Sequence, residues 1–199
     1  EILIGLVGSE MCIETAIGQS SNATGRGGVA LGNDTAATWN AFAAGWNAKA
    51  TGKGAIALGQ ATANSESAIA LGTNTSATAN SATAIGTSAA ASESSAVAIG
   101  NAANASKSDA IAFGTSAAAS ESSAIAIGKS TQAKSGKSIA VGEGAVADGT
   151  ATIAIGAGNN ATGWGATAIG KNVQVTRERS IGLGLSLIHI SEPTRPISI

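Results

Sequence analysis

The strongest constraint on this chain is a short motif, typified by Ser-Ala-Ile-Ala-Ile-Gly at residues 123–128, that returns at nearly constant intervals. From Gly72 onward the closing glycines are always fourteen positions apart, and before Gly72 some intervals are one position shorter. A fixed short period indicates a repeat protein, in which each unit packs mainly against its neighbours. Thirteen copies are closed by Gly18, Gly32, Gly45, Gly59, Gly72, Gly86, Gly100, Gly114, Gly128, Gly142, Gly156, Gly170 and Gly184.

Residue size alternates within each copy. Large residues such as Ile125 alternate with small ones such as Ala126, and a period of two is typical of a β-strand rather than a helix. The residue two before the closing glycine is alanine in twelve of the thirteen copies, with Gly182 the exception. A second, shorter alternation follows the glycine, as in Ala103 and Ala105, and predicts a second strand with one face inside and one outside.

Two short strands and two tight corners use up one repeat, which then corresponds to one turn of a parallel β-solenoid. Identical positions stack from coil to coil about 4.8 Å apart, so thirteen coils would form a rod on the order of 60 Å long. Proline lacks the N–H that a strand ladder needs, and none occurs up to Gly184. The sequence therefore predicts an all-β solenoid over residues 1–184, with one coil per repeat and a partial first copy ending at Gly5.

The first strand of each copy is apolar on both faces. Only one face can point into the coil, so something outside the coil must cover the other. We expect the isoleucine and valine row to fill the interior and the alanine row to lie outside, where small side chains let a second copy approach closely. The alternatives are the inverse assignment, with isoleucine at the subunit contact, and an alanine face that is simply exposed. The predicted subunit-contact residues are Ala84, Ala98, Ala112, Ala126, Ala140 and Ala154.

Composition argues against catalysis and against several classes of partner. Charged residues make up 12% of the chain and the net charge is −1, which gives no electrostatic case for nucleic acid or a membrane surface. His189 and Cys12 are the only residues of their kinds, and the acidic residues are scattered. We therefore predict no enzyme activity, no cofactor and no metal site. Neither a signal peptide nor a membrane span is visible, which favours an internal fragment.

A few residues in the corners are candidates for contact with a partner. Trp39 and Trp46 flank Phe42, which occupies a predicted core position, and exposed tryptophan is uncommon unless it packs on something. Trp164 shares the repeat position of Trp39, which favours a packing role for both. A small basic spot is predicted from Lys129, Lys134 and Lys137.

The stretch ESSAVAIGNAANASKSDAIAFGTSAAASESSAIAIG, residues 93–128, resembles the head repeats of YadA-like trimeric autotransporter adhesins. The pattern S-x-A-I-A-x-G-x-x-A-x-A matches nearly every copy from Gly18 to Gly184. The resemblance implies a left-handed parallel β-roll, assembled as a homotrimer and carried on the outer surface of a bacterium. It also implies attachment to extracellular matrix proteins, to host cells or to sister cells.

Two other functions are compatible with a bare repeat. Related repeats occur in phage tail fibres, so a purely structural fibre segment is the main alternative. An ice-binding solenoid is a remote one, because the outward position four residues after the glycine carries no threonine row and is interrupted by charge, as at Lys49.

The repeat pattern stops at Gly184. The next eleven residues, LSLIHISEPTR, contain the only histidine and resemble the translation of a transposase adapter used in sequencing libraries. We therefore expect residues 185–199 to be a non-native or disordered tail.

Overall fold

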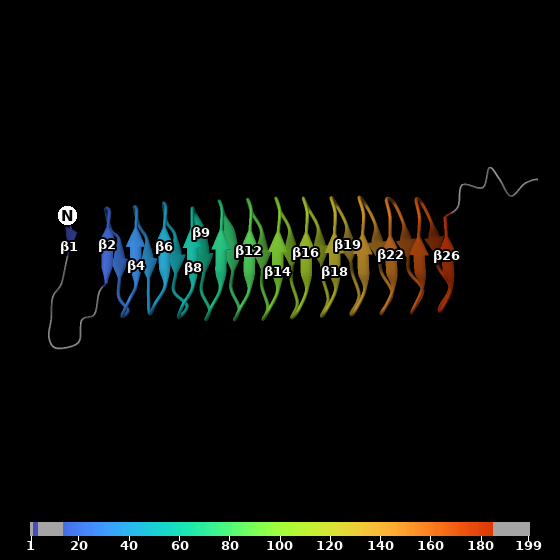
Figure 1. The fold of residues 1–199 in the computed structure, drawn as a ribbon, viewed down its shortest axis with the longest axis horizontal. Coiled ribbons are helices and arrows are strands. Elements are labelled where there is room, and N and C mark those ends of the chain that lie inside the picture. Colours follow the sequence, from blue (N-terminus) through green and yellow to red (C-terminus); the bar gives the residue numbers. More distant parts are fainter. Residues whose placement is uncertain (1, 4–13, 185–199) are drawn as a thin grey trace, which may run out of the picture.

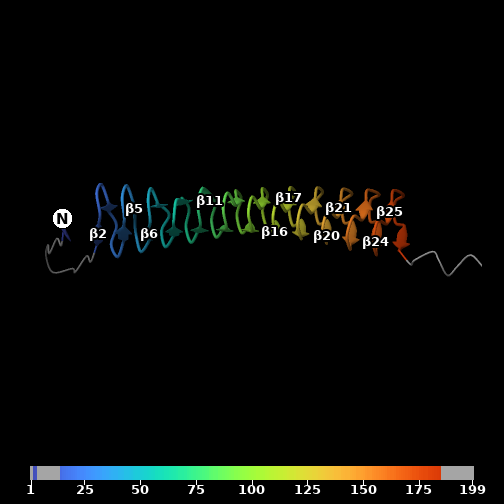
Figure 2. The ribbon, with the colours of Figure 1, turned by 90° about the horizontal axis from the view of Figure 1, so that it is seen from above.

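The computed structural model describes residues 2–3 and 14–184, which form only short β-strands and the turns between them. Fourteen strands make one sheet, sheet A, and twelve make a second, sheet B. The strands follow one another along a rod whose colour runs from blue to red in sequence order (Figure 1). Seen from above, the two sheets form two layers joined by turns at both edges (Figure 2).

Sheet A consists of the strands that precede the closing glycines, together with one short strand near the N-terminus. Its members are β1 (Ile2–Leu3), β2 (Thr15–Ile17), β4 (Val29–Leu31), β6 (Phe42–Ala44), β8 (Ile56–Leu58), β10 (Ile69–Leu71), β12 (Thr83–Ile85), β14 (Val97–Ile99), β16 (Ile111–Phe113), β18 (Ile125–Ile127), β20 (Ile139–Val141), β22 (Ile153–Ile155), β24 (Thr167–Ile169) and β26 (Ile181–Leu183).

Sheet B consists of the strands that follow the glycines. Its members are β3 (Asn22–Ala23), β5 (Ala36–Ala37), β7 (Lys49–Ala50), β9 (Ala61–Ala63), β11 (Thr75–Ala77), β13 (Ala90–Ala91), β15 (Asn104–Ala105), β17 (Ala118–Ala119), β19 (Gln132–Ala133), β21 (Val146–Ala147), β23 (Asn160–Ala161) and β25 (Gln174–Val175).

Each coil runs up one strand of sheet A, around a first corner, down one strand of sheet B and around a second corner to the next coil. Equivalent residues pair in parallel register, so that Ala98 lies between Ala84 and Ala112 in the middle of sheet A. This confirms the prediction of a parallel solenoid with one coil per repeat. Strand β1, which lies in the predicted partial copy, pairs with β2 in antiparallel orientation and so does not continue the parallel stack.

The interior of the rod is lined almost entirely by alanine. Four positions of each coil point inward, and in the coil that ends at Gly114 they are Ala103, Ala105, Ala110 and Ala112, all 0% exposed. The largest fully buried side chains are those of one asparagine, several threonines and one serine. Both sheets therefore turn their small side chains toward each other.

This arrangement corrects the predicted face of the alanine row. The six residues predicted as subunit contacts are each 0% exposed within a single chain, so they cannot touch a second copy. The physical reason is volume, because two strands of two or three residues joined by tight turns leave a space too thin for isoleucine. Phe42, predicted in the core, likewise lies on the outer face of sheet A. The corrected residues are Ala84, Ala98, Ala112, Ala126, Ala140 and Ala154.

The closing glycines are required by the distance between coils. At Gly114 the backbone has φ +132, and an added Cβ would lie 2.5 Å from the carbonyl oxygen of Gly128 in the next coil. Real Cβ atoms do not approach backbone this closely, and this φ region is essentially restricted to glycine. Close stacking of the coils therefore explains why glycine recurs at this position of every repeat.

Buried polar side chains form hydrogen bonds between neighbouring coils. Asn159 donates from Nδ2 to the carbonyl oxygens of Ile155 at 2.6 Å and Gly170 at 3.0 Å, and its Oδ1 accepts from the N–H of Val173 at 2.9 Å. Because its amide has partners on both sides, this polar group can occupy a fully buried position.

Cys12, His189 and the predicted tail over residues 185–199 lie outside the described residues.

Candidate functional site

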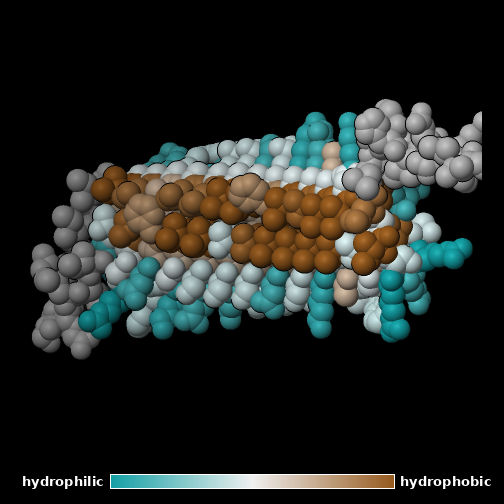
Figure 3. All heavy atoms as spheres, turned by 45° about the vertical axis from the view of Figure 1, so that its right-hand side comes forward, coloured by the Kyte–Doolittle hydropathy of each residue, from teal (hydrophilic) through white to brown (hydrophobic). Residues whose placement is uncertain are grey.

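The outer face of sheet A carries two parallel rows of large apolar side chains, which we call the apolar face. One row stands one residue before the closing glycines and the other stands three before, so both flank the buried alanine row. A brown, hydrophobic band runs along this side of the rod between paler and teal rims (Figure 3). Phe113 is 52% exposed, and the exposed members are Ile17, Ile111, Phe113, Ile127, Ile155, Ile169, Ile181 and Leu183.

No charged residue interrupts the apolar face between the described strands β2 and β26. Its two rows contain only Ile, Val, Leu, Phe and Ala, with threonine at Thr15, Thr83 and Thr167. Thirteen strands at about 4.8 Å and a width of about 10 Å give an area on the order of 600 Å². An apolar patch of this size lies at the upper end of the range found on monomers, and patches of this kind are often interaction sites. Residue volume was the signal in the sequence that could have favoured this face, because the interior of the described coils holds mainly alanine, with a few threonine, serine and asparagine side chains.

The two tryptophans predicted as partner contacts lie on opposite edges of the rod. Trp39 lies in a second corner, before β6, and is 57% exposed, whereas Trp46 lies in a first corner, directly after Gly45, and is 61% exposed. Trp39 lies close over Gly25 of the preceding coil, where an added Cβ would come within 2.6 Å of the indole Cδ1. They therefore form two separate exposed positions rather than one aromatic cluster.

Trp164 differs from Trp39 in its surroundings. The guanidinium carbon of Arg179, in the next coil, lies 4.5 Å from the centre of the Trp164 ring. Such a cation–π contact stabilises by about 0.5–1 kcal/mol at an exposed site. One face of Trp164 is thus occupied by its own chain, although 45% of the residue remains exposed.

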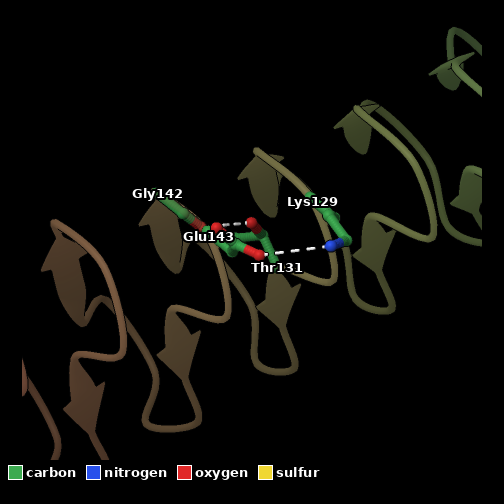
Figure 4. A network of polar contacts seen from close by, with 4 residues as sticks. All are labelled: Lys129, Thr131, Gly142 and Glu143. Carbon is green, nitrogen blue, oxygen red and sulfur yellow. Dashed lines mark hydrogen bonds and ion pairs between the residues drawn. The ribbon is translucent and has the colours of Figure 1, made fainter.

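The three predicted lysines do not form one basic spot. Lys129 lies in a first corner, whereas Lys134 and Lys137 lie in the following second corner at the opposite edge. Lys129 Nζ is 3.3 Å from Oε1 of Glu143, in the next coil (Figure 4). Both side chains are about two-thirds exposed to solvent, at 67% and 69%, so this ion pair adds at most about 1 kcal/mol.

A hydrogen bond inside the rod accompanies this surface ion pair. Thr131 Oγ1 donates to the carbonyl oxygen of Gly142 at 2.5 Å, and Thr75 donates in the same way to Gly86 (Figure 4 shows the first pair). These contacts tie one coil to the next, and because Thr131 and Thr75 are buried, their hydroxyls are not accessible to a partner.

Neither metal chemistry nor a membrane-spanning helix is indicated by the part of the chain that the structure describes. Within residues 2–3 and 14–184, no group of three or more histidine, cysteine or acidic side chains could hold a metal ion. No helix long and apolar enough to cross a membrane occurs among the same residues.

A parallel β-roll with an alanine interior, one long apolar face and polar corners is a fibrous repeat protein. Proteins of this class expose long, regular side surfaces along a rod. The family model of the YadA head domain repeat matches residues 15–35 and 40–62, and then overlapping segments from 63 to 172. These matches cover well over half of the chain, and the chain belongs to the family of YadA head repeats. This is a family of adhesins exposed on the bacterial surface, and not a family of enzymes.

The chain is similar to a solved structure. This is the crystal structure of the collagen-binding domain of the Yersinia adhesin YadA, which is 21% identical. The match covers 90% of this chain and 80% of that domain, with a TM-score of 0.33. Because this score is low, the family assignment rests on the repeat match alone. A comparison with curated proteins gives no match.

Proposed function

We propose that this chain is part of the head of a surface adhesin that assembles as a homotrimer and attaches a bacterium to extracellular matrix, host cells or sister cells. The observation that carries the proposal is the match to YadA head repeats over residues 15–35 and 40–172. In this proposal the apolar faces of the three copies pack against one another. The corners and the outer face of sheet B stay exposed and are available to contact other surfaces.

The apolar face supports assembly along the whole rod. Ile125 and Ile127 repeat in equivalent positions on strand after strand, so a second copy in the same orientation meets the same pattern at every level. Burying one fully exposed isoleucine side chain gains roughly 1.5–3 kcal/mol. The side chains of the apolar face are already partly buried, with Ile127 38% exposed, so each contributes a fraction of that value and each coil contributes up to two of them. Three copies around an axis parallel to the rod would cover all three apolar faces at once.

Assembly is tested by measuring the mass of the refolded chain, residues 1–199, with light scattering. We expect three copies per particle, and we expect the pair of substitutions Ile125→Ser and Ile127→Ser to weaken assembly. The matched control is Gln132→Ser on the outer face of sheet B, which should leave the particle trimeric. A monomeric wild-type chain would refute the proposed assembly.

The corner tryptophans are proposed contacts with the attached surface. Trp39 and Trp46 project from different edges, with 57% and 61% of the two residues exposed to solvent. Trp164 offers a control because Arg179 already covers one face of its ring. Aromatic anchors of this kind dominate the binding free energy of many protein interfaces.

Attachment is tested with beads coated with the full chain and applied to immobilised collagen, other matrix proteins and cultured cells. Collagen is included because the YadA domain compared above is described as collagen-binding. We expect retention that falls severalfold when Trp39 and Trp46 are both replaced by alanine, and little change for Trp164→Ala. Beads that adhere to none of these surfaces would favour a structural fibre segment over an adhesin head.

A further inference from the structure

The coil that ends at Gly45 reverses the sizes of the two rows on the apolar face. Every other coil carries Ile, Leu, Val or Phe one residue before its glycine, but this coil carries Ala44. Three residues before the glycine it carries Phe42, where the other coils have Ile, Val or Thr. This coil therefore has a larger side chain than usual in one row and a smaller one in the other. Among the described coils, only this one shows the reversal.

The register of sheet A places these two side chains in known surroundings. Phe42 stands between Val29 and Ile56 in its row. Ala44 stands between Leu31 and Leu58 in the other row, on the same face of β6 because residues two apart in a strand point the same way. At this level, therefore, one row has a protrusion and the other has a recess with a leucine on either side.

Rotational symmetry brings the two rows together. In a cyclic trimer each contact is heterologous, so the row at one side of a copy meets the other row of the next copy. Without any shift along the rod, Phe42 of one copy then lies opposite Ala44 of the next. A shift by one coil, about 4.8 Å, would place Phe42 against Leu31 or Leu58 and leave the recess empty.

We propose that Phe42 and Ala44 of neighbouring copies form a bump-and-recess pair that fixes the axial register of the trimer. The proposal rests on the proposed trimeric assembly and names a specificity contact within it. Such a contact is needed because a nearly uniform apolar face allows copies to slide by whole coils with little loss of contact. Because the sizes are reversed at one level only, the side chains of neighbouring copies pack most closely in one axial alignment.

Mixing experiments with four proteins test the pairing. They are the wild type, Phe42→Ile, Ala44→Leu and the double variant, whose Ile–Leu pair reproduces that of Ile56 and Leu58. Two chains, one of them isotopically labelled, are unfolded together, refolded and analysed by native mass spectrometry. The distribution of pure and mixed trimers is compared with the binomial distribution that indifferent chains would give.

The two single variants should prefer each other. A pure Ala44→Leu trimer opposes Phe to Leu three times, and a pure Phe42→Ile trimer opposes Ile to Ala three times. Mixed trimers replace two of these three mismatches by well-matched pairs, so we expect them roughly tenfold above the binomial expectation, the range of coupling between residues in direct contact. Recovery of trimers only on mixing would support the pairing equally.

The wild type and the double variant should do the opposite. Each is matched with itself, and their mixed trimers contain two mismatches, so we expect the two chains to sort into separate trimers. Coupling of Phe42 and Ala44 within one chain predicts binomial distributions in both mixtures and would overturn the proposal. A wild-type chain that forms no trimer would instead refute the proposed assembly itself, so the two failures are distinguishable.

Discussion

Replacing one closing glycine should disrupt the stacking of two coils. In Gly114→Ala the new Cβ would stand 2.5 Å from the carbonyl oxygen and 2.7 Å from the carbonyl carbon of Gly128. Both are backbone atoms held in the ladder, where the Gly128 N–H donates to the Phe113 carbonyl oxygen at 2.8 Å. Relief of the overlap therefore requires the two coils to separate.

The cost has two parts. Holding alanine at φ +132, a conformation used essentially by glycine, costs about 1–3 kcal/mol. Overpacking against a structure that yields only partly costs about 1–3 kcal/mol more. We expect a loss of about 3–5 kcal/mol in the free energy of unfolding of the coils involved, which is near the upper end for a point substitution.

Gly144→Ala is the matched control in the same kind of corner. Its φ is +64, and nothing lies within 4 Å of an added Cβ. The equivalent position of another coil already holds an alanine, Ala102, at φ 54. Only the left-handed conformation then disfavours alanine, at about 1 kcal/mol.

The measurement combines urea unfolding with amide hydrogen exchange. Long repeat arrays do not always unfold in one step, so exchange at the Gly128 amide reports the local effect more directly than a single midpoint. We expect this amide to exchange more than about 100-fold faster in Gly114→Ala than in the wild type, and its rate to change little in Gly144→Ala. Similar effects of the two substitutions would refute the argument that close stacking demands the closing glycines.

Three further predictions follow from the burial and the hydrogen bonds. Ala126→Leu should destabilise the isolated chain by about 1–3 kcal/mol by overpacking the interior, whereas Ile127→Leu on the apolar face should be nearly neutral, and equal urea midpoints would contradict the assigned faces. Asn159→Ala should cost about 1–2 kcal/mol in urea unfolding, because buried backbone groups lose a partner, and an unchanged midpoint would show that they find others. Lys129→Ala should change stability by less than about 1 kcal/mol at any salt concentration, since its ion pair with Glu143 is exposed, and a larger loss would assign the pair a structural role.

The sequence by itself determined the period, the strands and the order of the chain through the two sheets. A glycine at a nearly constant interval and an alternation with a period of two together indicate a stack of parallel coils. Both signals depend only on local geometry. The inward row of sheet B was also predictable, since Ala103 and Ala105 are small and regularly placed.

Only the tertiary structure decided which apolar row of sheet A lies inside. Hydrophobicity favours isoleucine for the interior, but Ile125 and Ile127 lie outside and Ala126 is 0% exposed, because the width of the rod sets the volume available. The same holds for Lys129 and Lys134, which are close in sequence yet lie at opposite edges, since the chain turns between them. Spacing along the chain fixes the repeat, whereas the distance between the two sheets, a property of the whole coil, fixes which side chains it can enclose.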